Sequence, residues 1–241
     1  ADVASIAVAY FRALDIFGMS GKVGVVVPMA TGTWSGTAFG VDTAVTRTGF
    51  ADPRMTVSVN FLGAPALGRS GMRTHRAKTV AGFQLSVQAP LGQYDPALLI
   101  NLGLNRWSFQ PRLGIAQAIS SHLIVESYVA ATFYAANPDF FGGTELTQEP
   151  FVEAQFHAIY NFSKPGLWLA GSIGYGRGAR IAIDGVKQES LENIHASAVL
   201  RVPVARRHGL KLVYINGLTT RLGADYDTFQ LGWQYAVGGR P

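Results

Sequence analysis

The sequence predicts an all-β fold, a transmembrane antiparallel up-and-down β-barrel of about twelve strands. Three observations carry this prediction: apolar residues recur at every second position, the chain is poor in charge and rich in glycine, and no apolar run is long enough for a membrane helix. Charged residues are 15% of the chain and glycine contributes 28 of 241 residues, whereas soluble proteins average roughly 25% charged residues. A helix span needs roughly 18 apolar residues; the longest approach, Val23 to Ala30, is interrupted at Pro28.

The alternation of apolar and polar residues is clearest in Phe151 to Phe162, where Val152, Ala154, Phe156, Ala158, Tyr160 and Phe162 alternate with mostly polar neighbours. The segments Arg54 to Phe61, Gly82 to Ala89, Asn193 to Val202 and Thr228 to Val237 share this period. A period of two is the repeat of a strand with one apolar and one polar face. Each segment has about the ten residues that a tilted strand needs to cross a bilayer.

The predicted strands can be placed in chain order. They cover residues 4–15, 21–29, 37–47, 54–63, 78–90, 106–118, 121–133, 149–162, 166–177, 191–204, 208–220 and 226–237. The count is even, as it is in bacterial single-chain barrels. We expect one domain over residues 1–241. Because Ala1 to Tyr10 lacks the basic stretch that opens a signal peptide, either a signal has been removed or an N-terminal segment is missing.

The connections between the predicted strands alternate in length. If the last strand ends in the periplasm, the short connections 120–121, 163–165 and 205–207 lie on the periplasmic side, and the long ones 91–105, 134–148 and 178–190 lie outside. Short periplasmic turns and long external loops are the rule for such barrels. The connection 64–77 breaks the rule, so it is either an elaboration or a sign that the strand count nearby is off by one.

A soluble antiparallel sandwich is the alternative fold, because its strands also alternate apolar and polar residues. Sandwich strands usually have about five or six residues, which is shorter than the segments here. Aromatic residues also gather toward the ends of the apolar faces, as with Tyr160 and Phe162 or Trp233 and Tyr235. Those are the positions of the aromatic girdles at a membrane interface, so the sequence favours the membrane barrel.

Composition excludes several classes of site. The chain has no cysteine, which removes disulfides, thiolate metal sites and cysteine nucleophiles. Its net charge of +5 is not clustered beyond Arg206, Arg207 and His208, so we expect no nucleic-acid binding. The five histidines show no spacing typical of metal ligands. We therefore expect neither a metal nor a cofactor.

The polar residues of the predicted strands are candidates for lining the lumen. By strand phase these are Gln84, Gln88, Gln110, Arg112, Glu153, Gln155, His157, Asn161, His195, Arg201, Lys211 and Arg221. About twelve strands leave a lumen between a filled one and an open aqueous one. One interpretation is a permeation path in which Arg and Lys favour anionic or hydrogen-bonding solutes. The other is a structural network in which Glu153 and Glu126 pair with Arg112 or Arg201.

The loop from Leu91 to Trp107 contains further candidates. Tyr94, Leu98, Leu99, Ile100 and Trp107 would fold inward as an apolar constriction, with Asn105 and Arg106 as anchors. The alternative is an Asn-Arg-Trp corner that only stabilises the loop. Phe140 and Phe141 are open to a similar choice between a ligand contact and anchoring at the level of lipopolysaccharide.

The C-terminal segment resembles the assembly signal of outer-membrane proteins. Gln230, Gly232, Tyr235 and Val237 place a polar residue, a glycine and then aromatic and apolar residues in the phase of the last strand. The segment departs from the usual signal because it continues through Gly238 to Pro241. The resemblance implies that the barrel assembly machinery is a partner during biogenesis.

A second resemblance covers most of the chain. It is carried by eight stretches: Asp52 to Arg54, Asn60 to Leu67, Ala89 to Asp95, Asn101 to Gly103, Asn105 to Phe109, Phe140 to Gly143, Pro165 to Trp168 and Arg207 to Leu212. These stretches resemble the family known as Putative MetA-pathway of phenol degradation. This resemblance implies an outer-membrane channel for small, aromatic molecules. It does not imply a phenol-degrading enzyme.

Catalysis has little support in the sequence. Gly174 to Ala179 imitates a dinucleotide fingerprint, but no helix is predicted after it. His157 is the one mid-strand histidine with polar neighbours, and its inward phase does not suit attack on a lipid. We expect a monomeric, non-enzymatic outer-membrane channel for passive uptake of small hydrophobic or aromatic solutes, surrounded by outer-membrane lipid and lipopolysaccharide. The alternatives are a barrel-embedded lipid-modifying hydrolase and a structural barrel without transport.

Overall fold

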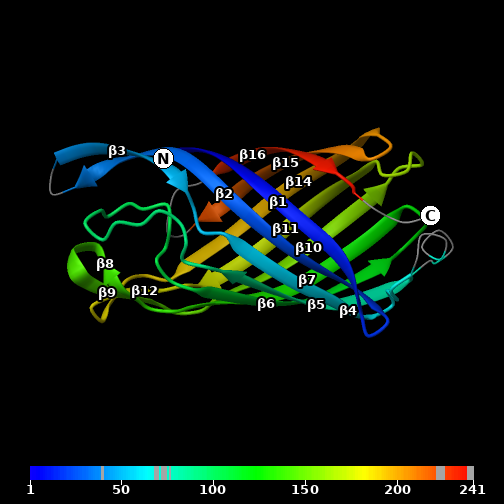
Figure 1. The fold of residues 1–241 in the computed structure, drawn as a ribbon, viewed down its shortest axis with the longest axis horizontal. Helices are drawn as coiled ribbons and strands as arrows, with labels where there is room; N and C mark the ends of the chain where they lie inside the picture. Colours follow the sequence, from blue (N-terminus) through cyan, green and yellow to red (C-terminus); the bar gives the residue numbers. More distant parts are fainter. Residues whose placement is uncertain (39–40, 68–70, 72–74, 76, 221–225, 238–241) are drawn as a thin grey trace.

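The fold is one large antiparallel sheet that curls around a central space, with a small second sheet at one end (Figure 1). The computed structural model describes residues 1–38, 41–67, 71, 75, 77–220 and 226–237. The predicted all-β fold is confirmed. No helix among the described residues is long and apolar enough to cross a membrane.

Eleven strands follow one another around the wall in the described residues. They are β1 (Asp2–Ile16), β2 (Met19–Ala38), β4 (Arg54–Leu62), β5 (Thr79–Gln88), β6 (Ser108–Ala118), β7 (Leu123–Tyr134), β10 (Phe151–Asn161), β11 (Trp168–Gly178), β14 (Leu191–Ala205), β15 (His208–Thr220) and β16 (Asp227–Tyr235). A twelfth strand of the same sheet, β3 (Val41–Phe50), pairs with β2 alone. Each neighbour in the wall pairs antiparallel.

The second sheet is formed by β8 (Asn137–Phe140), β9 (Thr144–Gln148), β12 (Ile181–Ile183) and β13 (Val186–Lys187), with the short 3₁₀ helix η1 (Phe141–Gly143) between β8 and β9. It is built from the long connections that follow β7 and β11. Figure 1 shows it at the same end of the molecule as β3. We call this end the loop end, and the opposite end, which carries the connections after β1, β4, β6, β10 and β14, the turn end.

The apolar face of the wall points outward. Mid-strand side chains such as Leu113, Ile115, Val129 and Ile173 are each more than half exposed. The total accessible area is 15312 Å², whereas a compact soluble protein of this mass exposes roughly 10,500 Å². A soluble sandwich would hide this face against a second sheet, so the exposed apolar surface fits a lipid surround.

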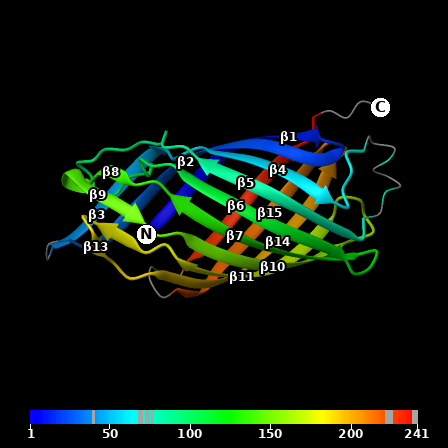
Figure 2. The ribbon, with the colours of Figure 1, turned by 90° about the horizontal axis from the view of Figure 1, so that it is seen from below.

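The polar face is the concave one. The Arg112 guanidinium on β6 reaches Glu153 on β10 at 3.5 Å across the intervening β7. Gln155 on β10 likewise reaches the ring of His195 on β14 at 3.1 Å across β11. Contacts that skip a strand require the sheet to curve toward the side chains that make them. The wall therefore encloses a polar interior, and Figure 2 shows this curl from a second direction.

The strand boundaries differ from the prediction around residues 30–36. The sequence predicts separate strands at 21–29 and 37–47, but β2 is one strand of 20 residues. Its first part, Gly21–Val26, pairs with β4, and its second part, from Met29, pairs with β3. Thr31 and Thr33 favour a strand, and the strand runs through residues 30–36 without a turn. All twelve predicted strands belong to the large sheet, but β3 pairs with β2 alone, so eleven of them form the wall. The connection 64–77 still joins β4 to β5 at the turn end, so it is an elaboration.

The turn end has short connections, as predicted, apart from the one between β4 and β5. At the β1–β2 turn, Phe17 and Gly18 both have positive φ, as a tight two-residue hairpin turn requires. The Asp15 carboxylate accepts a hydrogen bond from the Gly18 amide at 2.8 Å. The long β4–β5 connection starts at this end too, where the Ser20 amide donates to the Ala64 carbonyl at 2.9 Å.

The two edges of the wall are β1 and β16. No backbone ladder joins these two strands, both of which lie in the described part of the chain. Because successive strands of the wall are antiparallel and their number is odd, β1 and β16 run in the same direction. Outward side chains on both edges, such as Val8 and Leu231, are more than 70% exposed.

Candidate functional site

Register places the predicted lumen residues on the concave face of the wall. Gln84 lies opposite Arg112, Glu153 opposite Ala130, and His195 opposite Gly174. The same face holds Gln88, Gln110, Gln155, His157, Asn161, Arg201 and Lys211. Arg221 lies outside the described residues. That these side chains line a permeation path stays a prediction.

A polar cluster crosses the middle of the concave face around Arg112. Its guanidinium pairs with Glu153 and lies 4.0 Å above the ring of Tyr128. Gln110 donates to Thr132 at 3.0 Å and to Glu153 at 3.4 Å. This Arg112–Glu153 pair agrees with the structural-network interpretation. Glu126 and Arg201 take part in no ion pair within the described chain.

The cluster continues toward β14 through Gln155. Tyr128 donates a hydrogen bond to the Gln155 side-chain oxygen, and the Gln155 amide meets His195 Nε2 at 3.1 Å. On the same strand, His157 Nδ1 lies 2.6 Å from the Ser172 hydroxyl. Hydrogen-bonded side chains on five successive strands thus form a continuous band on the inner face, which restricts how far each side chain extends into the lumen.

Glycines on β11 give these side chains room to lie against the wall. The His195 ring lies over Gly174 and the Phe151 ring lies over Gly176, so that a Cβ at either glycine would collide with the ring. The sequence shows these residues only as a run that imitates a dinucleotide motif. Gly174 and Gly176 face the concave side, where the lack of a side chain leaves room for the Phe151 ring of β10 and the His195 ring of β14.

A chamber of about 300 Å³ opens on the concave face at the loop end. Its walls come from β4, β5, β6, β7 and β10, and one residue of the loop after β5, Leu104, covers it. It is lined by Arg54, Ser86, Gln88, Leu104, Ser108, Gln110, Thr132, Tyr134, Phe151 and Glu153. Strand phase predicts Gln88, Gln110 and Glu153. The sequence analysis missed Arg54, Leu104 and Phe151. Strand phase could have found Arg54 and Phe151, because both lie on strands. It could not have found Leu104, because a loop residue has no strand phase.

Two buried side chains hold the loop that carries Leu104. The Asp52 carboxylate accepts hydrogen bonds from the amides of Gly92 and Leu104, both at 2.8 Å. Asn137, which is 1% exposed, donates to the Tyr94 hydroxyl at 2.9 Å and accepts from the Asn105 side chain at 3.0 Å. The loop is therefore fixed at both ends rather than free to move as a spacer.

Arg106 anchors the same loop from within. It is 8% exposed, lies 5.0 Å from the ring of Tyr134 and donates to the Gln148 side chain. Burial lowers the pKa of the Arg106 guanidinium, since desolvation disfavours its charged form. Its Nη1 has no hydrogen-bond partner. Asn105 and Arg106 therefore fix the loop in the way that the interpretation of a stabilising corner predicts.

The interpretation that Trp107 folds inward as part of a constriction is wrong. The Trp107 ring is 44% exposed and stacks on Phe109 with 6.5 Å between ring centroids. Phe109 lies opposite Phe133 on the outward face. The phase of β6 carries Trp107 outward, because Ser108 is the residue that faces the chamber. Tyr94 does not fold into the lumen either, since it lines a separate loop pocket of about 540 Å³.

The remaining candidates lie at the two ends of the wall. Phe140 ends β8 and Phe141 begins η1, at the loop end. On β16, Gln230 lies opposite Val213 and Gly232 opposite Lys211, both on the inner face, and Tyr235 ends the strand beside His208. Val237 follows the strand and is exposed. The ligand, anchoring and assembly roles of these residues stay predictions.

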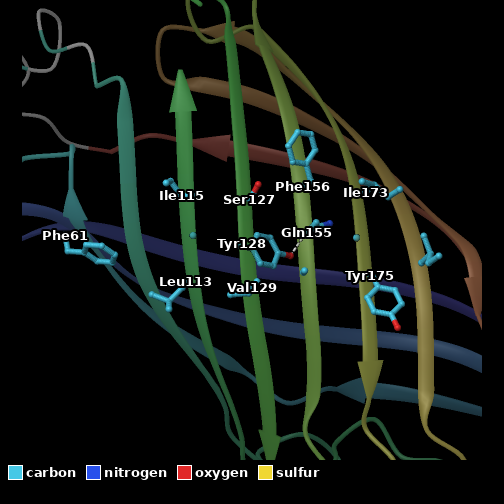
Figure 3. Close-up of a pocket in the computed structure, with 14 residues that line it drawn as sticks. Phe61, Leu113, Ile115, Ser127, Tyr128, Val129, Gln155, Phe156, Ile173 and Tyr175 are labelled. Carbon is cyan, nitrogen blue, oxygen red and sulfur yellow. Dashed lines mark hydrogen bonds between the residues drawn. The ribbon is translucent and has the colours of Figure 1, made fainter. Parts of the chain in front are cut away.

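Another hollow lies on the other side of the wall. It has a volume of about 740 Å³ and is lined mainly by outward apolar residues of β6, β7, β10 and β11, including Leu113, Val129, Phe156 and Ile173. Figure 3 shows these side chains along the strands, with the Tyr128–Gln155 hydrogen bond beside them. This hollow is mainly apolar and lies on the outward face, so the polar chamber is the better candidate for a solute.

Comparisons with known proteins agree with this architecture. The fold is similar to that of an outer membrane channel from Pseudomonas putida F1, with a TM-score of 0.77 at 20% sequence identity, over 97% of this chain and 82% of that chain. A search of the curated proteins found no match. The sequence profile of the family described as Putative MetA-pathway of phenol degradation matches residues 6–191, which is most of the chain. The resemblance seen in the sequence is thereby confirmed, and the chain belongs to this family.

Proposed function

We propose that this chain is an outer-membrane channel for passive uptake of small hydrophobic or aromatic solutes through a restricted lumen. The observation that carries the proposal is the arrangement of the two faces of the wall, with apolar side chains outward and hydrogen-bonded polar side chains inward. Only a membrane barrel with a polar interior requires that arrangement. The fold shared with an outer membrane channel supports it.

The preference for solutes with an apolar part is supported by the inner face of β1 and β2. In the register of these strands, Ala7 faces Pro28, Ala9 faces Val26 and Phe11 faces Gly24. Most polar residues of the interior lie on β4 to β14, although Lys22 on β2 and Lys211 on β15 also face inward. A lumen with an apolar strip and a hydrogen-bonding wall suits a molecule that has one apolar side and one polar group.

The surroundings of the channel follow from the same arrangement. The outward apolar band is covered by outer-membrane lipid, and the loop end faces lipopolysaccharide and the medium. The C-terminal pattern on β16 is the part that the barrel assembly machinery binds during biogenesis. The channel works as a monomer.

One contact favours a different function. His157 Nδ1 and the Ser172 hydroxyl are 2.6 Å apart, the pairing that activates a serine nucleophile. The His157 Nε2 atom, however, has no carboxylate or amide hydrogen-bonded to it within the described residues. Backbone amides of the surrounding strands are already used in the ladders, so these strands offer no backbone amides for an oxyanion hole. A hydrolase therefore ranks second, and Ser172→Ala would abolish its activity.

Single-channel conductance of the refolded protein in a planar bilayer tests the proposal. Conductance steps that phenol blocks, and that a sugar of similar size leaves unchanged, are the expected result. A fully folded barrel that never conducts would contradict an open pore and leave the hydrolase or a structural barrel. Steps that the sugar blocks as well as phenol would contradict the stated class of solute.

A further inference from the structure

The chamber at the loop end has an uneven charge balance. Glu153 is its one acidic lining residue, and this carboxylate is already paired with Arg112 at 3.5 Å. Arg54 is the one cationic lining residue, and within the described residues its guanidinium bonds only to the Gln88 side-chain oxygen, at 3.2 Å. A guanidinium has five N–H donors. Most donors of Arg54 therefore have no protein partner within the described residues.

A second positive charge lies behind the chamber wall. Arg106 is buried against Tyr134, which lines the chamber, and its Nη1 has no hydrogen-bond partner. No ion pair joins Arg106 to an acidic residue in the described part of the chain. Both Arg54 and Arg106 act electrostatically on the Tyr134 hydroxyl. Two positive charges thus lie at the loop-end side of the chamber, and neither Arg54 nor Arg106 makes an ion pair within the described residues. The Asp52 carboxylate is linked to Arg54 only through the Gln88 side chain.

The rest of the chamber offers apolar surface. The tip of the Phe151 ring lies over Gly176, and Leu104 lines the chamber from the loop. Leu104 is held there because its amide donates to the buried Asp52 carboxylate at 2.8 Å. A flat ring and a fixed aliphatic side chain form a slot for a small apolar or planar group.

We propose that this chamber is a binding site for a small organic carboxylate, with its carboxylate on Arg54 and its apolar body between Phe151 and Leu104. The site would give the channel a preference for monoanions with an apolar body over neutral molecules of the same shape. The proposal rests on the proposed function, since the solute has to enter the lumen from the loop end. Planar guanidinium groups match carboxylates in a two-point hydrogen bond.

Binding is measured by fluorine NMR on the protein refolded in detergent micelles, with three probes. 4-Fluorobenzoate has both the charge and the ring, 4-fluorobenzamide has the ring alone, and trifluoroacetate has the charge without a ring. We expect 4-fluorobenzoate to bind about 10-fold more tightly than either of the others, because it alone combines a charge-assisted hydrogen bond to Arg54 with an apolar ring. Arg54→Gln should remove the advantage of the benzoate over the benzamide.

Two further variants separate the site from general effects. Arg177→Gln makes the same change on β11 at an outward, exposed position, and should leave all three affinities unchanged. Leu104→Ala removes the apolar cover and should weaken the benzoate and the benzamide alike. Folding of every variant is checked by its heat-dependent shift on gels.

Equal affinities for benzoate and benzamide would overturn the proposal, as would an Arg54→Gln variant that binds benzoate like the unmodified protein. The fate of the channel is decided separately by conductance. Arginine-dependent binding to a protein that never conducts would keep the chamber and reject the channel. Conduction without such binding would keep the channel and reject the chamber.

Discussion

At the scale of single residues, Asp52 is one of the two buried side chains that hold the loop after β5. It is 5% exposed and accepts from the amides of Gly92 and Leu104 and from the Gln88 side chain. Asp52→Ala leaves two part-buried amides without acceptors, at about 1 kcal/mol or more each. We expect urea unfolding in lipid vesicles to show a loss of about 2 kcal/mol or more in the free energy of unfolding.

The matched control for this change is Asp95→Ala. Asp95 also accepts a hydrogen bond from a backbone amide, that of Ala97, but it is exposed and the contact is local. It should cost less than about 0.5 kcal/mol. An Asp52→Ala variant as stable as Asp95→Ala would show that the loop does not depend on the buried carboxylate.

Gly176 decides where the Phe151 ring lies. Gly176→Ala puts a methyl group in the place of that ring, so the ring must swing off the wall into the lumen. We expect a clear fall in single-channel conductance, and its recovery in the double variant with Phe151→Ala. Gly171→Ala is the control, because nothing lies within 4 Å of a Cβ there. Equal conductance in Gly176→Ala and Gly171→Ala would contradict the close packing of this ring.

Residue-level prediction from the sequence succeeded where a single rule was enough. Strand phase alone places Gln110, Arg112 and Glu153 on one face, because the period of a strand is two. It fails for Leu104 and Asp52, since contacts between a loop and a strand end 52 residues away leave no periodic trace. Trp107 is a different case, because the predicted strand 106–118 with Gln110 and Arg112 inward already places residue 107 on the outward face, and the loop interpretation did not use that phase.

At the scale of elements, the β2–β3 hairpin stands apart from the wall. β3 pairs with β2 alone, and Figure 1 shows the hairpin projecting beyond the other strands at the loop end. Threonine pairs, Thr31 with Thr48 and Thr33 with Thr46, join its two strands by side-chain hydrogen bonds of 2.7 and 3.0 Å. These pairs stabilise the hairpin locally and add nothing to the wall.

We therefore expect that the tip of the hairpin is dispensable for folding. Gly32 and Arg47 are partners in the ladder, so residues 33–46 can be replaced by an Asn-Gly turn, which closes a two-residue hairpin. The shortened protein should keep its heat-dependent gel shift. Removal of 22–26, which pairs with β4, should abolish that shift. Loss of folding in the first variant would contradict the separation of hairpin and wall.

The elements also show what periodicity resolves and what it does not. Long alternating runs such as 151–162 predicted strands within a residue or two of β10. The strands predicted at 21–29 and 37–47 do not show that β2 is continuous, because a glycine such as Gly32 occurs in strands as well as in turns and the pairing partner decides between them. The small sheet of β8, β9, β12 and β13 was predicted as loop, since its strands are too short to show a period.

At the scale of the whole molecule, the inside-out distribution of apolar residues is the property that the sequence predicts best. It follows from composition and period together, and neither depends on exact boundaries. The closure of the wall is a different matter. Whether β1 and β16 meet depends on the number of strands and their direction, and a miscount of one strand reverses the direction of an edge.

The orientation of the wall gives a prediction for the whole molecule. Long connections at one end and short turns at the other place the loop end outside the cell. The chain has no cysteine, so a single introduced cysteine reports its own position without background. Ser35 on the projecting hairpin and Ser121 in the β6–β7 turn are both exposed and lie at opposite ends. On intact cells, a membrane-impermeant maleimide should label Ser35→Cys and leave Ser121→Cys unlabelled until the outer membrane is permeabilised. Labelling of Ser121→Cys but not of Ser35→Cys on intact cells would show the opposite orientation. The chamber would then lie on the periplasmic side, where an incoming solute would not meet it first.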